Sequence, residues 1–191
     1  RGKAGAQQMN VSYQQAAEFL LQSDDFVILC HQNPDGDTLG SGYALWNALT
    51  NLGKRAVIRC SDPVPHKLRH VTAGYREEPF EPKTVVSVDI ADEQLFGEGI
   101  SEYLSKVDLA VDHHASHAFF AKRVLLEPDA AANCEIICQL IRELGAPFTP
   151  QIAACLYTGM ATDTGCFKFS NTTPRTHRLA AEMMEAGCDY A

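Results

Sequence analysis

The chain has 191 residues, of which 46% are hydrophobic and 21% charged, and its formal net charge at pH 7 is -8. This composition is that of an ordinary globular protein with one domain, or one domain and a fragment. The acidic balance argues against long duplex DNA as a partner, because phosphate binding needs surfaces rich in Lys and Arg. No membrane partner is expected either, because no apolar stretch approaches the length of a membrane span and no signal-peptide pattern appears.

The seven cysteines are odd in number and lie mostly inside apolar patterns. They are interpreted as reduced core residues of a cytoplasmic protein. Residues 1–10, of which the first eight are rich in Gly, Ala and Gln, are interpreted as a tag remnant or a disordered end. Residues 11–191 are predicted to form one domain.

Hydrophobic periodicity predicts strands and helices that alternate along the chain. Strands are predicted at 26–30, 55–60, 84–89, 107–112 and 123–126. Helices are predicted at 12–22, 38–52, 131–144, 150–162 and 174–186, with weaker helical stretches at 66–71 and 94–105. This alternation predicts an α/β fold whose mainly parallel sheet has helices on both faces.

The turn after the first predicted strand holds three potential metal ligands, His31, Asp35 and Asp37, within seven residues. A turn can direct three side chains toward one point, whereas a regular strand would divide them between two faces. Imidazole and carboxylate groups together suit Mn²⁺, Mg²⁺, Fe²⁺ or Zn²⁺. The alternative interpretation is an Asx turn in which Asp37 caps the following helix.

Two further predicted strands also end at acidic residues, one of which is followed by histidines. The strand at 84–89 ends on Asp89, and the strand at 107–112 runs into Asp112, His113 and His114. Asp163 follows the helix at 150–162. Because parallel strands place their carboxyl ends at one edge of the sheet, these groups are expected to converge.

Charge counting indicates two divalent ions at this edge. Asp35, Asp37, Asp89 and Asp163 would repel one another and raise each other's pKa if they met without cations. Two bridged ions would balance the four charges and supply a hydroxide nucleophile for phosphoester hydrolysis. The structural alternatives are a helix cap for Asp89 and a satisfied core histidine for His114.

Asp112 has its own interpretation. An acid beside a ligand histidine more often orients that histidine than binds the metal, so Asp112 is expected to act through its neighbours.

The chain resembles the DHH superfamily of phosphoesterases over about residues 24–190. The resemblance rests on four motifs that occur in the family's order: His31-x-Asn33-Pro34-Asp35-x-Asp37, Val86-Ser87-Val88-Asp89, Asp112-His113-His114 and Thr162-Asp163-Thr164-Gly165. It implies a five-stranded parallel sheet in α/β layers.

The resemblance also implies roles for individual residues. Two Mn²⁺ ions, with Mg²⁺ or Fe²⁺ as alternatives, would be held by His31, Asp35, Asp37, Asp89, His113 and Asp163. Asp89 would bridge the ions. His114 would contact the phosphate or protonate the leaving group.

Within the superfamily, the segments 35–41 and 165–173 are most similar to the bacterial nanoRNase/pAp-phosphatase group, which is RecJ-like. Its members hydrolyse short oligoribonucleotides or 3′,5′-bisphosphate nucleotides (pAp), and relatives hydrolyse cyclic dinucleotides. They carry a DHH-associated C-terminal domain, whose Gly-rich motif ending in His does not occur here. That domain is therefore expected to be absent from this chain.

Two further residues are considered as substrate contacts. Lys168 is the best-placed cation for a phosphate, and His117 is either a further phosphate contact or, as the favoured interpretation, a surface histidine. The alternative functions are an inorganic pyrophosphatase of the related Mn²⁺ family and a catalytically silent nucleotide-sensing module. A homodimer is left open.

Overall fold

The computed structural model describes residues 9–190. Its centre is a parallel sheet in the order β1-β6-β5-β4-β2-β3. The strands are β1 (Met9–Asn10), β2 (Phe26–Leu29), β3 (Ala56–Arg59), β4 (Thr84–Val88), β5 (Leu109–Asp112) and β6 (Arg123–Leu126). The prediction of a parallel α/β sheet is confirmed.

The prediction of five strands is wrong, because β1 adds a sixth at one edge of the sheet. Met9 pairs with Arg123 and Asn10 with Val124. The prediction of a tag remnant or disordered end therefore fails for these two residues, while residues 1–8 lie outside the described residues. A strand of two residues is too short to leave a periodic signal in the sequence.

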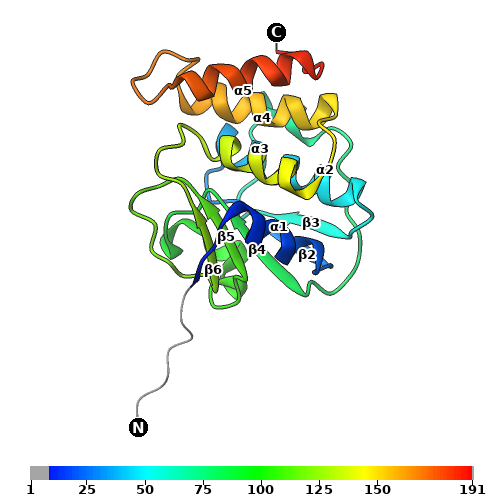
Figure 1. Cartoon of the computed structure of the whole chain (residues 1–191). Coiled ribbons are helices and arrows are strands. Elements are labelled where there is room, and N and C mark those ends of the chain that lie inside the picture. Colours follow the sequence, from blue (N-terminus) through cyan, green and yellow to red (C-terminus); the bar gives the residue numbers. More distant parts are fainter. Residues whose placement is uncertain (1–8, 191) are drawn as a thin grey trace.

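The α-helices all lie on one face of the sheet (Figure 1). They are α1 (Tyr13–Leu21), α2 (Gly36–Asn51), α3 (Asn133–Leu144), α4 (Pro150–Asp163) and α5 (Pro174–Glu185). Helices α1, α2 and α3 cover the sheet, and α4 and α5 form further layers above α2 and α3. No helix within residues 9–190 combines the length and apolar character that crossing a bilayer requires.

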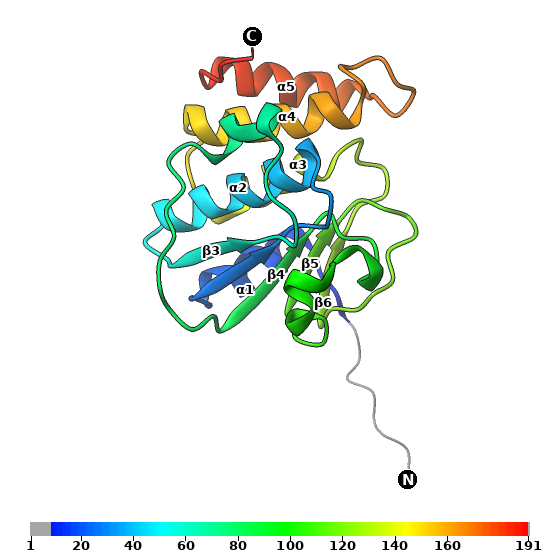
Figure 2. The same ribbon diagram turned by 180° about the vertical axis from the view of Figure 1, so that it is seen from behind.

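The opposite face is covered by short 3₁₀ turns (Figure 2). These are η2 (Glu93–Leu95) and η3 (Glu98–Tyr103), which replace the single weak helix predicted at 94–105. Phe96 and Ile100 from this segment are buried against the sheet. Gly97, with φ of 77°, separates the two turns, and a left-handed residue cannot continue a helix.

Two glycines allow α2 and α4 to approach closely. A Cβ atom on Gly40 of α2 would collide with the carbonyl oxygen of Cys155 in α4. A Cβ atom on Gly159 of α4 would collide with the Cys134 side chain and approach Asp37. This close packing brings the amino end of α2 beside the carboxyl end of α4, where Asp163 lies.

Candidate metal centre

The turn between β2 and α2 is fixed by hydrogen bonds of its own residues. The Asp35 carboxylate caps α2 by accepting hydrogen bonds from the backbone N–H groups of Asp37 (3.1 Å) and Thr38 (3.0 Å). The Thr38 hydroxyl donates to the Val88 carbonyl oxygen (3.0 Å), which ties the turn to β4. Asp35 is therefore the helix cap, and the alternative that assigned this role to Asp37 is wrong.

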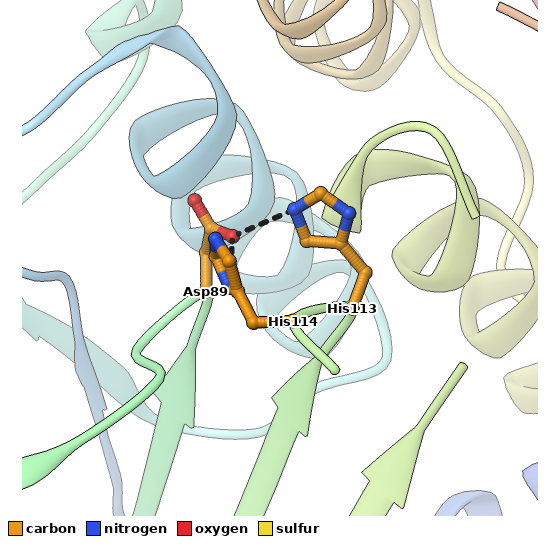
Figure 3. Close-up of side chains that lie close together, drawn as sticks. All are labelled: Asp89, His113 and His114. Atoms are coloured by element: carbon orange, nitrogen blue, oxygen red, sulfur yellow. Dashed lines mark ion pairs between the residues drawn. The ribbon is translucent and has the colours of Figure 1, made fainter. Parts of the chain in front are cut away.

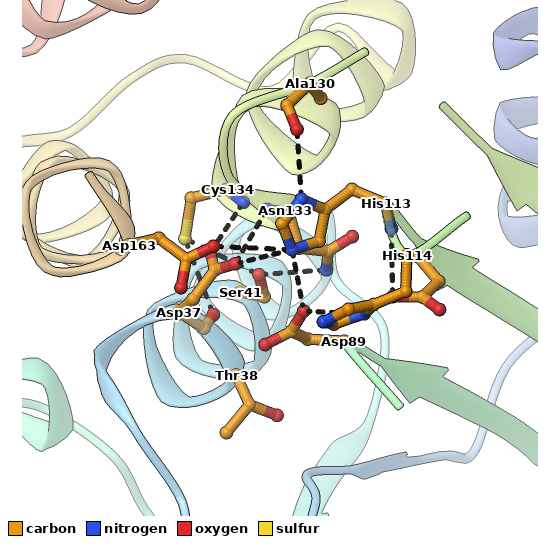
Figure 4. Close-up of polar contacts among 12 residues, drawn as sticks. Asp37, Thr38, Ser41, Asp89, His113, His114, Ala130, Asn133, Cys134 and Asp163 are labelled. Carbon is orange, nitrogen blue, oxygen red and sulfur yellow. Dashed lines mark hydrogen bonds and ion pairs between the residues drawn. The ribbon is translucent and has the colours of Figure 1, made fainter. Parts of the chain in front are cut away.

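Asp37 instead caps a different helix. Its buried carboxylate accepts hydrogen bonds from the backbone N–H groups of Asn133 (2.8 Å) and Cys134 (3.0 Å), at the start of α3 (Figure 4). The N-cap residue of α3 is Ala132, which offers no side-chain acceptor. The positive end of α3 thus stabilises the Asp37 carboxylate. The sequence signal for this contact was a well-formed helix without a cap of its own.

Asp89 follows β4 and lies between two histidines. Its Oδ1 atom is 3.3 Å from His113 Nε2, and its Oδ2 atom is 3.7 Å from His31 Nε2. Figure 3 shows the Asp89 side chain just beyond the end of β4, where it faces His113 and His114. Asp89 adopts a left-handed φ of 61°, a conformation that is uncommon outside Gly, Asn and Asp and that recurs at functional sites.

The structure brings the six predicted ligands together in two groups that meet at Asp89. His31 Nε2 lies 3.5 Å from Asp35 Oδ1, and His113 Nε2 lies 3.5 Å from Asp37 Oδ2 and 3.4 Å from Asp163 Oδ2. Each group has three donor atoms close enough to share an ion: His31, Asp35 and Asp89 in one, and Asp37, His113 and Asp163 in the other.

The hydrogen bonding of the donor atoms is consistent with binding of a divalent cation. The Nδ1 atoms of His31 and His113 are hydrogen-bonded to the carbonyl oxygens of Gln32 (2.7 Å) and Ala130 (3.0 Å), which leaves each Nε2 directed at the acids. Such a bond at one ring nitrogen is the usual support of a metal-ligating histidine. Asp89 Oδ1 and His113 Nε2 are buried and have no hydrogen-bond partner. A shared cation would satisfy both atoms.

The electrostatics of the site also favour binding of a cation. Burial, together with the carboxylates of Asp89 and Asp163, raises the pKa of Asp37 well above its ordinary range. Burial and the neighbouring Asp89 carboxylate raise the pKa of Asp163 to about 6. Although burial opposes protonation of the histidines, the neighbouring carboxylates raise the pKa of His31 to about 11 and that of His113 to about 10.

Asp112 holds two histidines at the rim of this cluster. Its carboxylate accepts hydrogen bonds from His114 Nδ1 (2.7 Å) and His117 Nδ1 (2.8 Å), and these bonds overcome burial to lower its pKa. The His114 side chain is 41% exposed, and its Nδ1 lies 3.7 Å from Asp89 Oδ1. His114 can therefore reach a molecule bound at the cluster while Asp112 fixes its orientation.

His117 is buried inside the protein. Its side chain is fully buried and packs against Phe119 and Phe120, so the prediction of a surface histidine is wrong. A buried ring is also badly placed to contact a substrate phosphate. The structure instead gives His117 the task of holding Asp112, which sequence reasoning did not foresee because spacing does not report burial.

Lys168 lies on a loop that begins beside Asp163. The side chain is exposed and makes no ion pair within the described part of the chain, so its role as a phosphate contact stays a prediction. Asn171, which sequence reasoning missed, donates hydrogen bonds to the carbonyl oxygens of Asp163 (3.0 Å) and Ala131 (3.3 Å). The loop is thereby joined to the segment before α3 and to the proposed ligand itself.

A parallel sheet with acids and histidines gathered at its carboxyl edge defines an α/β domain with a candidate metal centre. The chain belongs to the DHH family, because the family model described as "DHH family, N-terminal domain" matches residues 25–160. A bifunctional oligoribonuclease and PAP phosphatase, NrnA, from Thermus thermophilus is 35% identical over 172 residues, which cover 86% of this chain and 51% of the relative.

NrnA of Bacillus subtilis is 25% identical over 85% of this chain and 53% of its own length. The chain thus spans about half the length of the curated relatives it matches.

Solved structures share the fold. An exopolyphosphatase-related protein from Bacteroides fragilis superposes with a TM-score of 0.82 at 22% identity, covering 93% of this chain and 57% of its own. The exonuclease RecJ bound to manganese superposes with a TM-score of 0.59 at 16% identity, covering 92% of this chain and 48% of its own. At these identities the likeness concerns the fold alone.

Proposed function

We propose that this chain carries the metal centre of a phosphoesterase that hydrolyses short oligoribonucleotides or pAp with two Mn²⁺ ions. The observation that carries the proposal is the position of Asp89, whose two carboxylate oxygens face His31 and His113 from between two groups of acids. A carboxylate in this position is suited to bridge two ions. The similarity to NrnA of Thermus thermophilus supports the nucleotide substrates.

The ligand set would be His31, Asp35, Asp37, Asp89, His113 and Asp163. When bound, the ions would supply Lewis-acid activation of the attacking water and would stabilise charge on the phosphoryl oxygens. Manganese is favoured because carboxylates and imidazole nitrogens suit it, and because the fold-related RecJ was solved with this metal.

The protein's own groups would then orient the substrate and move a proton. His114 is directed toward the cluster and is held through Nδ1 by Asp112, so its Nε2 is the nitrogen that would face a bound phosphate. In this position His114 would donate a hydrogen bond to the phosphate or a proton to the leaving oxygen. Lys168 remains a candidate phosphate contact on the adjoining loop.

The test is Mn²⁺-dependent product release from a dinucleotide, pAp, cyclic di-AMP and pyrophosphate, measured side by side with the wild-type chain and an Asp89→Ala control. Cleavage of the dinucleotide or pAp in the wild type alone is expected. Preference for pyrophosphate would contradict the proposed substrate class and favour a pyrophosphatase. Bound metal without cleavage of any of the four would contradict an active hydrolase and favour a nucleotide-sensing module.

A further inference from the structure

A groove leads away from the candidate metal centre between α4 and the 3₁₀ turn η1 (His66–Thr72), which Figure 2 shows beside α4. It consists of two adjoining cavities of about 270 Å³ and 660 Å³. The smaller cavity is lined by Asp35 and Gly36 of the metal centre, and the larger one extends to Tyr190. Both are lined by Lys67, Leu68 and Thr162, so they form one continuous surface.

The wall formed by η1 is basic in a chain with a net charge of -8. Within seven residues η1 carries four groups that are or can become cationic, and no acid: His66, Lys67, Arg69 and His70. All four are exposed, and none makes an ion pair with another residue within 9–190. Lys67 and His70 are the two that line the cavities, whose lining also includes Asp189. Elsewhere in the fold, cations such as Arg55 pair with acids of the chain itself. An unpaired basic stretch is the electrostatic signature of a surface that receives an anion.

The opposite wall offers aromatic and small side chains. Tyr157 of α4 and Tyr190 line the larger cavity, with ring centroids 6.0 Å apart. Tyr190 is 59% exposed, so one face of its ring is open. Ala154 and Ala161 leave room between the rings and η1. Cations on one wall and open aromatic faces on the other are the two elements of single-stranded nucleic-acid binding surfaces.

We infer that this groove binds the nucleotides of an oligoribonucleotide that lie beyond the scissile phosphate, with Lys67 contacting a backbone phosphate and Tyr190 stacking on a base. The inference rests on the proposed function, since the groove begins at Asp35 of the candidate metal centre. It assigns the chain a preference for oligonucleotides over pAp, which is too short to extend along the groove.

The experiment compares hydrolysis of a pentanucleotide with hydrolysis of pAp in the presence of Mn²⁺, as a ratio of kcat/KM values. The wild type is expected to favour the pentanucleotide. Lys67→Glu should lower this ratio, and the slope of log KM against log salt for the pentanucleotide should shrink by about 0.7, as expected for one lost phosphate contact on a single strand. Tyr190→Ala should lower the ratio about fivefold through the lost stacking.

Lys106→Glu is the matched control. Lys106 is exposed, carries the same charge and lies just before β5, at the amino-terminal edge of the sheet and away from the metal centre. Its replacement should leave the ratio and the salt slope at the wild-type values. An equal effect of Lys106→Glu and Lys67→Glu would show that only the net charge of the protein matters, and this would overturn the inference.

A binding measurement separates the inference from the proposed function. Fluorescence anisotropy of a labelled pentanucleotide and a labelled dinucleotide, at several salt concentrations, reports on the groove even if the chain hydrolyses nothing. Tighter binding of the pentanucleotide that is weakened by Lys67→Glu supports the groove whatever the activity. Equal affinities for the two lengths, or a Lys67→Glu variant that changes only the oligomeric state in sedimentation, would overturn it and indicate a protein interface.

Discussion

The acids at the two edges of the sheet have different partners. At the amino-terminal edge, Asp25 precedes β2 and is paired with Arg55 at 2.7 Å and with Lys83 at 3.6 Å. At the same edge Asp108 is paired with Lys122 at 3.1 Å. At the carboxyl-terminal edge, the four acids Asp35, Asp37, Asp89 and Asp163 have histidines near them, and no Lys or Arg pairs with them within residues 9–190.

This difference shows which acids serve the fold alone. Asp25 carries a left-handed φ of 55°, as Asp89 does with 61°, so backbone strain does not distinguish the two edges. What distinguishes them is the source of positive charge. The amino-terminal edge is neutralised by the chain's own side chains, whereas the carboxyl-terminal edge retains a negative charge that a cation from outside would balance.

The largest expected effect is that of Asp89→Ala. Because both donor groups include or contact this carboxylate, its removal should eliminate the bridge and lower turnover by at least about a thousandfold, with less bound Mn²⁺. Activity and metal content by elemental analysis provide the measurement. Turnover equal to that of the wild type would contradict the assignment of two metal ions bridged by Asp89.

His114→Ala is expected to slow hydrolysis on the order of a hundredfold, as for a lost general acid, while leaving bound Mn²⁺ in place. The reason is that the ring of His114 is held by Asp112 and lies at the rim of the cluster. Metal titration followed by turnover distinguishes the two properties. Loss of metal from this variant would move His114 into the ligand set.

Asp89→Asn should change the stability of the metal-free protein little, because it removes both the repulsion of Asp37 and Asp163 and the attraction to His31 and His113. Asn also tolerates the left-handed backbone at this position. With Mn²⁺ at about a hundred times its Kd, the wild type should gain about 2.7 kcal/mol and the variant less. Denaturant unfolding with and without chelator measures both, and an equal gain with Mn²⁺ in the two proteins would contradict the argument.

The smallest effect is expected for Asp25→Asn, which should lower Tm at pH 7 and leave bound Mn²⁺ unchanged. The hydrogen bond from Arg55 holds the folded-state pKa of Asp25 below its ordinary value of 3.8. The stabilisation is therefore present above pH 3.8 and is lost as the pH falls through the folded-state pKa. Thermal unfolding of both proteins across this pH range should show their Tm values converging in acid. A constant difference would contradict the ion-pair explanation.

The sequence predicted the sheet, its parallel strands and the convergence of the six proposed ligands, because these follow from local periodicity and from a general property of parallel sheets. It did not predict the long-range details. The contact of Asp37 with the start of α3 joins residues 96 positions apart, and no local pattern encodes such a pairing. The strand at Met9–Asn10 was missed for the same reason, since it pairs with the distant β6. The burial of His117 was missed although its partners Asp112, Phe119 and Phe120 are local, because residue spacing does not report exposure.

The proposed ligands are distributed from His31 to Asp163, on four different segments of the chain. A chain emerging from the ribosome therefore presents the first donor group, which ends with Asp89, well before α4 supplies the last member of the second. The second donor group is incomplete until α4 has been added, so only a chain complete through α4 could hold both ions.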